Sequence, residues 1–211
     1  VLKANACGHG LIRTSDWLVK ECGIKRLAVA QVREAEQLRR AGSQAEIMVL
    51  GGVPVNNLPY AVQENLILPV FRTQDAALLS ALAQENGRTA RVHIKIDTGL
   101  GRIGVEKGEQ LEELLDGILP LKGLEIEGVF THFGEAEVTD PEFTEIQISR
   151  FEEALGQIRA RGIQPRYIHA TNTPSTVRFK KAHYNMIRTG LLWLGYDPCL
   201  DEDNRLGLET V

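Results

Sequence analysis

The sequence predicts an α/β protein, a parallel (β/α)8 barrel of the TIM type. Short apolar runs typical of strands alternate with amphipathic runs typical of helices along nearly the whole chain, and eight such strands can be distinguished. The chain has 211 residues, of which 43% are hydrophobic. This is enough for one sizeable core, although the barrel usually takes about 250 residues.

Each expected strand is a run of mostly apolar residues, and most end at glycine, proline or polar residues. The strands are expected at residues 1–3, 26–30, 46–50, 66–70, 91–97, 124–133, 166–170 and 186–194. Most of the expected helices show apolar residues at helical spacing. The helices are expected at residues 11–22, 32–41, 55–64, 73–87, 107–118, 142–161 and 174–179. Gly42 ends the second helix, Pro59 interrupts the third, and Thr73 is expected to cap the fourth.

An open, doubly wound sheet is the alternative fold. Residues 99–104 read Gly-Leu-Gly-Arg-Ile-Gly and follow a strand, as in a dinucleotide-binding loop. However, no such loop follows the first strand, and no later strand carries a ribose-binding acid at the expected distance. The barrel is therefore the favoured fold.

Composition excludes several function classes. The formal net charge is −4 without a basic block, which argues against nucleic acid as a partner. Cys7, Cys22 and Cys199 have neither zinc-site nor Cys-x-x-Cys spacing, so we expect no metal site and a reducing, cytoplasmic setting. No apolar run is long enough to cross a bilayer, so no membrane partner is expected.

Polar side chains gather where the expected strands end, which is where barrels of this class carry their chemistry. These residues are Lys3, Lys95, Asp97, Arg102, Thr131, His132, His169, Asn172, Thr173, Arg188 and Gly190. Singly, each is also explained as a satisfied polar group at a strand end. Together they suggest a phosphate site after the last two strands, a lysine for a Schiff base and an arginine for a ring nitrogen. That set of groups describes pyridoxal 5'-phosphate.

Four stretches resemble motifs of one family, in that family's order. They are residues 1–10 (Val-Leu-Lys-Ala-Asn-Ala-Cys-Gly-His-Gly), 93–104 (His-Ile-Lys-Ile-Asp-Thr-Gly-Leu-Gly-Arg-Ile-Gly), 128–133 (Gly-Val-Phe-Thr-His-Phe) and 185–190 (Asn-Met-Ile-Arg-Thr-Gly). The family is that of the alanine racemases. The resemblance implies a pyridoxal phosphate barrel over residues 1–198, lacking part of its N-terminal segment, and a linker at 199–211.

The resemblance also implies roles for individual residues. Lys3 carries the cofactor as a Schiff base and is one of two catalytic bases. Arg188 meets the pyridine nitrogen, and His132 supports that arginine. Lys95 matches a lysine that is often carbamylated in the family and positions Arg102 near the substrate carboxylate. The phosphate-binding stretch corresponds to Asn172, Thr173, Gly190 and Leu191.

By resemblance, the full-length protein is a homodimer that racemises a small amino acid, alanine first, and supplies D-alanine for peptidoglycan. The second base is a tyrosine of a C-terminal β-domain that this chain does not include, contributed to the partner subunit's site. Cys7 stands where the family usually has a tyrosine that helps to hold the phosphate, which bears on cofactor affinity. Two alternatives are a non-enzymatic barrel for pyridoxal phosphate homeostasis and a serine racemase of the same family.

Overall fold

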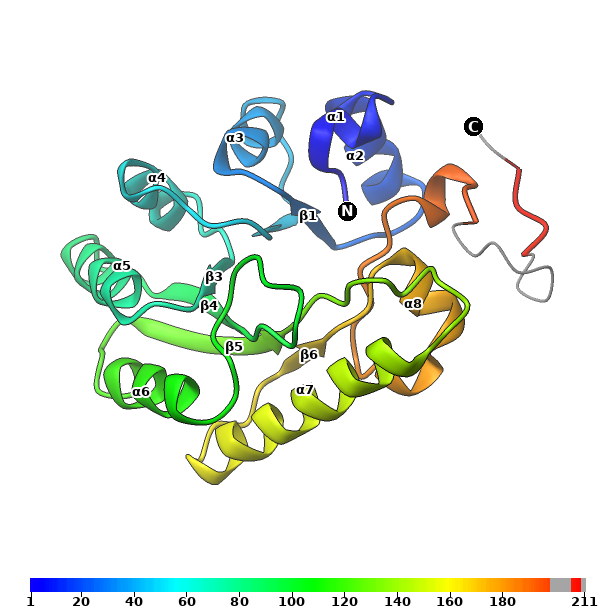
Figure 1. Cartoon of the computed structure of the whole chain (residues 1–211). Helices are drawn as coiled ribbons and strands as arrows, with labels where there is room; N and C mark the ends of the chain where they lie inside the picture. The colour runs from blue at the N-terminus through cyan, green and yellow to red at the C-terminus, as the bar shows by residue number, and fades with distance from the viewer. Residues whose placement is uncertain (198–205, 210–211) are drawn as a thin grey trace. The chain divides into compact units, whose positions relative to one another are not determined.

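The computed structural model describes residues 1–197 and 206–209. Its helices and strands follow one another along the chain as Figure 1 shows. The elements are α1 (Lys3–Cys7), α2 (Leu11–Lys20), β1 (Arg26–Val29), α3 (Val32–Arg40), β2 (Glu46–Val49), η1 (Val55–Asn57), α4 (Leu58–Gln63), β3 (Leu68–Val70), α5 (Thr73–Glu85), β4 (Ala90–Lys95), α6 (Glu109–Ile118), β5 (Leu124–Phe130), α7 (Glu142–Ala160), β6 (Tyr167–His169), α8 (Thr173–Arg178), η2 (Lys180–Ala182) and η3 (Leu192–Leu194).

The chain divides into two compact units. The first unit holds residues 1–93 and 117–126, and the second holds residues 94–116 and those from 127 onward. In the first unit, β1 and β2 pair in parallel, with Leu27 opposite Ile47. In the second unit, β5 and β6 pair in parallel, with Phe130 opposite His169. Parallel pairing with helices between the strands is the pattern that the sequence predicts.

Within the described residues, strands form at six of the eight expected places. The first expected strand is wrong, because Lys3 instead begins the short helix α1, although the Leu2 N–H still donates to the Ala28 carbonyl of β1 at 2.7 Å. The eighth is also wrong, because residues 186–194 contain only the 3-10 turn η3. The expected boundary at residue 198 and most of the expected linker, 199–205 and 210–211, lie outside the described residues.

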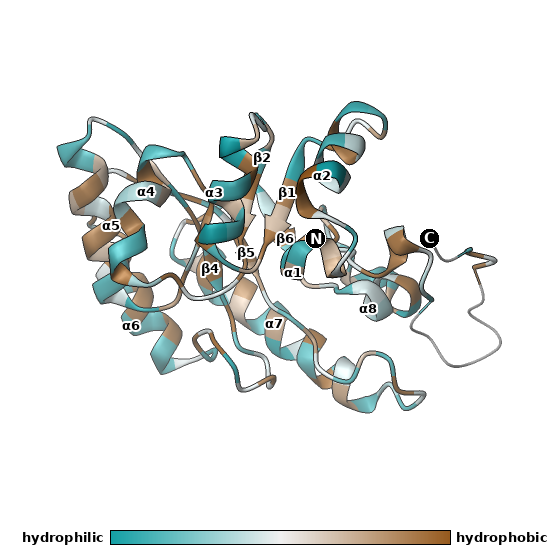
Figure 2. Cartoon of the chain, turned by 90° about the horizontal axis from the view of Figure 1, so that it is seen from above, coloured by the Kyte–Doolittle hydropathy of each residue, from teal (hydrophilic) through white to brown (hydrophobic). Residues whose placement is uncertain are grey.

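The core of the first unit is formed by strand residues and by one face of each helix. Leu27, Val29, Ile47 and Val49 are almost fully buried, and so is Ala35 of α3. Figure 2 shows hydrophilic and hydrophobic residues alternating along the helices, as expected of helices with one buried and one solvated face. The predicted cap of α5 is wrong, since Arg72 occupies the N-cap position, Thr73 is the first residue of the helix, and the N-cap side chain makes no capping bond.

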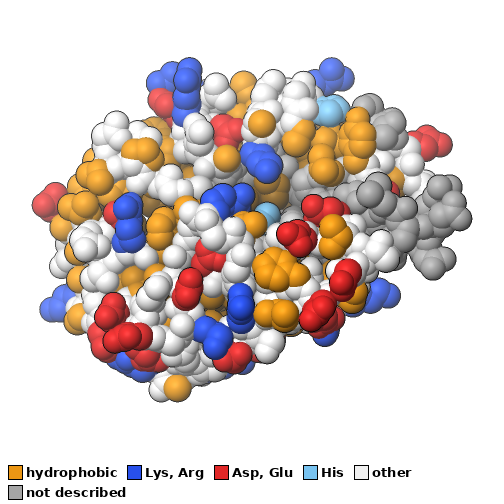
Figure 3. Space-filling model, in the orientation of Figure 1, with side chains coloured by type: hydrophobic (Ala, Val, Ile, Leu, Met, Phe, Trp, Pro, Cys, Tyr) orange, Lys and Arg blue, Asp and Glu red, His pale blue; other side chains and the backbone are white. Residues whose placement is uncertain are grey.

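The second unit is built around β5, β6 and the long helix α7. Phe130, Phe151 and Leu155 are fully or almost fully buried there. Gln157 of α7 accepts a hydrogen bond from the Gly108 N–H at 2.8 Å, which ties α7 to the start of α6. Acidic and basic side chains are interspersed over the face shown in Figure 3, in keeping with the small net charge. Among the described helices, none has the length and apolar character needed to cross a membrane.

Candidate active site

Lys3 opens a left-handed turn in the first unit. Ala4, Asn5, Ala6 and Cys7 all have φ between 53° and 56°, a region that costs a non-glycine residue about 1–2 kcal/mol. The neighbouring side chains of Leu2 and Ala6 are completely buried, while Lys3 itself is exposed. The Lys3 side chain therefore lies at the surface of the first unit, directly before the turn.

Arg188 is buried in the second unit and held by fixed acceptors. Its Nη1 donates to His169 Nδ1 at 2.8 Å, and its Nη2 donates to the carbonyl oxygens of Thr131 at 2.7 Å and Ala170 at 3.0 Å. Because a guanidinium only donates, His169 Nδ1 must carry a lone pair. Burial first, and the charge of Arg102 second, lower the pKa of Arg188 to about 9, so the group remains protonated at neutral pH.

His132, which the sequence predicts to support Arg188, is the more distant of two imidazoles that contact this guanidinium. Its Nδ1 lies 3.4 Å from Arg188 Nη2, whereas His169 Nδ1 lies within 2.8 Å of Nη1. His169 is fully buried and stacks on Phe130 with ring centroids 4.8 Å apart. The main imidazole support of Arg188 is therefore His169, at the end of β6. His169 is one of the strand-end residues expected from the sequence, but none of the resembling motifs contains it, so no role was predicted for it.

Lys95 ends β4 inside the second unit with only 1% of its surface exposed. Its Nζ donates to the Ile96 carbonyl at 2.8 Å and lies 5.4 Å from the centre of the Phe130 ring. No carboxylate of the described residues lies within 4 Å of this amine. Burial first, and the charge of Arg188 second, lower the pKa of Lys95 to about 7. Asp97 raises this pKa, and the smaller effect of Arg102 lowers it.

The Gly-Leu-Gly-Arg-Ile-Gly stretch is a loop fastened by Asp97. The Asp97 carboxylate accepts backbone hydrogen bonds from Gly99 at 2.8 Å and from Gly101 and Arg102 at 3.2 Å each. Gly104 has φ +128°, and a Cβ there would come within 2.6 Å of the Asp97 nitrogen. The glycines allow the backbone to turn back tightly in this loop. Arg102 lies exposed on the loop. Its charge is nevertheless close enough to lower the pKa of both Lys95 and Arg188.

Three of the residues predicted to bind phosphate lie together. Thr173 Oγ1 accepts hydrogen bonds from the N–H groups of Gly190 at 2.9 Å and Leu191 at 3.2 Å. Asn172 does not point its side chain at them. Its amide oxygen caps α8 by accepting from the Ser175 N–H at 3.2 Å, and its amide nitrogen donates to the Phe133 carbonyl at 3.1 Å. Asn172 therefore shapes the turn, and Thr173 meets the backbone amides.

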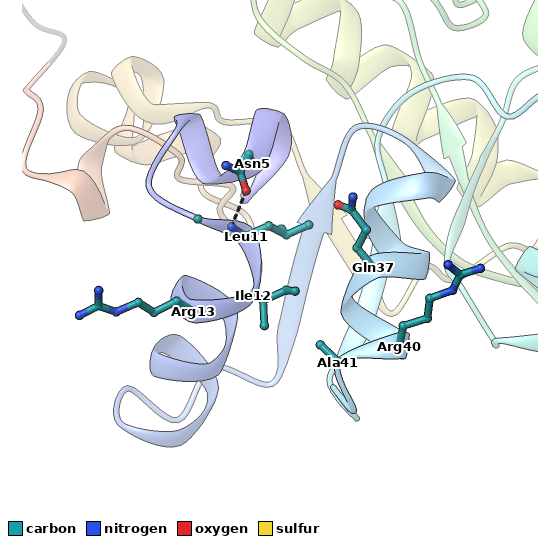
Figure 4. Close-up of a pocket in the computed structure, with 8 residues that line it drawn as sticks. Asn5, Leu11, Ile12, Arg13, Gln37, Arg40 and Ala41 are labelled. Carbon is teal, nitrogen blue, oxygen red and sulfur yellow. Dashed lines mark hydrogen bonds between the residues drawn. The ribbon is translucent and has the colours of Figure 1, made fainter.

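A pocket of about 500 Å³ lies in the first unit between α3 and the α1–α2 segment (Figure 4). Its lining includes Asn5, Leu11, Ile12, Gln37 and Arg40. None of the predicted site residues lines this pocket. The structure thus brings Lys95, Arg188, Thr173, Gly190 and Leu191 into the second unit, and Lys3 belongs to the first.

The comparisons with known proteins agree on one family. A family model described as the N-terminal domain of alanine racemase matches residues 1–198. The chain is 36% identical over 203 residues to an alanine racemase of Desulforamulus reducens and 38% identical over 208 residues to one of Carboxydothermus hydrogenoformans. These alignments cover 96% and 98% of the chain and 55% of each relative, so the chain spans about half the length of the curated relatives it matches.

The solved structures lead to the same family. A structure of alanine racemase from Clostridium difficile in complex with cycloserine matches 99% of the chain and 57% of its own, with a TM-score of 0.92 and 28% identity. One from Bacillus anthracis with bound L-Ala-P matches 99% of the chain and 53% of its own, with a TM-score of 0.88 and 32% identity. These matches confirm the predicted fold class, an α/β barrel domain with parallel strands.

Proposed function

Because the chain belongs to the alanine racemase family, we propose that it is the cofactor-binding barrel domain of a pyridoxal 5'-phosphate-dependent enzyme that interconverts L- and D-alanine. The barrel domain would cover residues 1–198, and residues 199–211 would lead toward a C-terminal β-domain. The enzyme would be cytoplasmic and would supply D-alanine for peptidoglycan.

The fixed guanidinium of Arg188 is the observation that carries this proposal. Both terminal nitrogens are occupied by His169 and backbone carbonyls, and none of the described residues accepts from the remaining Nε–H. A buried donor of this kind fits a pyridine nitrogen. Since Arg188 keeps its proton at neutral pH, it would donate a hydrogen bond to that nitrogen and leave it unprotonated.

The second unit also contains groups that could bind the phosphate of the cofactor. The N–H groups of Gly190 and Leu191 lie 2.9 and 3.2 Å from the Thr173 hydroxyl oxygen. Hydroxyls and backbone amides at the end of a barrel are the donors that phosphate groups take. Cys7, where the family usually has a tyrosine, adds only a weak donor, so we expect the cofactor to bind less tightly than in relatives with that tyrosine.

The cofactor, when bound, supplies the electron sink that makes the α-proton of an amino acid removable. Lys3 would hold the cofactor through its amine and then act as a base toward the α-proton on one face of the substrate. Arg102 would bind the substrate carboxylate. Lys95, a neutral amine at slightly alkaline pH, would form a carbamate with CO₂ and release one proton to solvent. The carbamate anion would pair with Arg102 and offset the positive charges of Arg102 and Arg188.

Return of the proton on the opposite face requires a second base. By family resemblance this is a tyrosine of the C-terminal domain of a second subunit, which makes the active enzyme a homodimer. The interspersed charges on the face shown in Figure 3 and the small net charge fit a small-molecule substrate better than nucleic acid.

Racemisation of L-alanine and of D-alanine by the intact protein with pyridoxal phosphate tests the proposal, with L-serine as the competing substrate. We expect alanine to be converted in both directions with the higher kcat/KM. A clear preference for serine would instead support a serine racemase. Cofactor binding without turnover of either amino acid would support a non-enzymatic pyridoxal phosphate protein.

A further inference from the structure

The Glu34 side chain, on the first turn of α3, joins two separate backbone segments of the first unit. Its Oε1 accepts a hydrogen bond from the Ala4 N–H at 2.6 Å. Its Oε2 accepts from the Ala30 N–H at 2.8 Å and the Gln31 N–H at 3.1 Å. One carboxylate thus bridges the residue after Lys3 and the turn between β1 and α3.

The first of these bonds is not needed for the helix. A glutamate on the first turn of a helix commonly accepts a hydrogen bond from the backbone N–H of the residue before the helix. The bond from Gln31 already fills this role. The Ala4 contact joins residues 30 positions apart in sequence. A charged acceptor makes a stronger bond than a neutral one, so this contact restrains the Lys3 turn more than an amide would.

The Lys3 turn needs such a restraint. Four consecutive non-glycine residues are left-handed, and a short run of this kind persists only where its surroundings enforce it. Three contacts do so. The Leu2 N–H donates to the Ala28 carbonyl of β1 at 2.7 Å, Asn5 Oδ1 accepts from the Leu11 N–H at 2.8 Å (Figure 4), and Glu34 holds Ala4. Of the three, the Glu34 bond is the nearest side-chain contact to Lys3 along the chain.

We infer that Glu34 is a positioning residue for Lys3. By holding the Ala4 N–H, it fixes the backbone immediately after the cofactor lysine and so fixes the direction in which the lysine side chain leaves the turn. Glu34 touches neither cofactor nor substrate in this account. The inference rests on the proposed role of Lys3 and adds a specific residue to it.

Glu34→Gln in the intact protein tests this, because the amide has one oxygen and cannot accept from both backbone segments. Glu36→Gln is the matched control. It makes the same chemical change on the same helix, where Glu36 pairs with Arg40 at the surface. The first readout is hydrogen exchange of the peptide covering residues 1–11, which needs no cofactor. We expect exchange to rise roughly 10-fold or more in Glu34→Gln and to stay at the wild-type rate in Glu36→Gln.

The second readout is the attachment of pyridoxal phosphate to Lys3, which borohydride traps. The labelling of Lys3 is measured relative to that of Lys25, which serves as an internal reference. The visible spectrum of the attached cofactor is recorded as well. We expect Glu34→Gln to lower the ratio of Lys3 to Lys25 labelling and to shift that spectrum. A general loss of folding would instead make all lysines more accessible and would not lower labelling of Lys3 selectively. Wild-type exchange and labelling in Glu34→Gln would overturn the inference. A wild-type protein without label on Lys3 would overturn the proposed function instead, and the exchange data would still decide whether Glu34 holds the turn.

Discussion

Replacing Lys95 with methionine should stabilise the protein and flatten its pH dependence. Lys95 is almost fully buried beside Arg188, and these surroundings lower its pKa from 10.5 to about 7. In the unfolded chain the same amine has its ordinary pKa. Between pH 7 and 10.5 the unfolded state therefore binds more protons than the folded state, so the stability of the fold rises with pH over this window.

The two pKa values set the magnitude. At pH 7 the burial of Lys95 costs the fold roughly 4 kcal/mol relative to a lysine with an unchanged pKa, and this cost falls by roughly 3 kcal/mol by about pH 9.5. Lys95→Met removes the ionisable group but also the 2.8 Å bond to the Ile96 carbonyl, worth about 1 kcal/mol. We therefore expect the variant to be more stable than the wild type at pH 7 by about 2–3 kcal/mol.

Urea unfolding in CO₂-free buffer at a series of pH values measures this difference. Lys107→Met is the control, because Lys107 is partly exposed and pairs with Glu153 on the surface. The difference between wild type and Lys95→Met should narrow as the pH rises, and bicarbonate should stabilise only proteins that retain Lys95. A difference that is constant with pH, or a Lys95→Met protein less stable than the wild type at pH 7, would refute this reasoning.

Three further predictions concern the phosphate groups, the loop after β4 and the second base. Thr173→Val, which loses the hydroxyl that meets two backbone amides, should weaken pyridoxal phosphate binding roughly tenfold in a titration, whereas Thr176→Val on the same helix should not. Gly104→Ala should lower the free energy of unfolding in urea by roughly 1–3 kcal/mol more than Gly108→Ala does. Both glycines have positive φ, but of the two only Gly104 has a backbone atom 2.6 Å from the added Cβ, so equal losses would count against the tight loop. The 211-residue chain alone, given cofactor, should racemise alanine roughly 10²–10⁴-fold more slowly than the intact protein, and equal turnover would place the second base within these residues.

Hydrophobic periodicity was sufficient to predict β1 to β6 and the helices between them. The apolar runs at residues 46–50 and 124–133, for example, contain β2 and β5. Periodicity could not predict the first element, because Val1 and Leu2 read as a strand while Ala4 to Cys7 adopt a left-handed turn. That conformation is imposed by distant contacts such as Glu34 to Ala4 rather than by the residues' own preferences.

Residues 185–194 illustrate a second limit of sequence patterns. Residues 186–194 are apolar enough to predict a strand, yet Asn185 meets β6 through its side chain as well as its backbone. Its Oδ1 accepts from the Ile168 N–H at 2.8 Å, and its Nδ2 donates to the Arg166 carbonyl at 2.8 Å. Side-chain bonds of this kind substitute for a backbone ladder, and no hydrophobic pattern encodes them.

Within the candidate site, motif resemblance identified Arg188 and Lys95, but it did not rank the partners of Arg188. His132 follows β5 and His169 is the last residue of β6, and the resemblance assigned the supporting role to His132. Which imidazole reaches the guanidinium depends on the pairing of β5 with β6, where Phe130 lies opposite His169. That geometry gives His169 the shorter contact.

The proposed enzyme depends above all on the covalent attachment of pyridoxal phosphate to Lys3. Borohydride reduction of the intact protein incubated with the cofactor, followed by peptide mapping, tests it directly. We expect the label on Lys3, and we expect Lys3→Ala to abolish it. A label on another lysine, or no label on a folded protein, would contradict it.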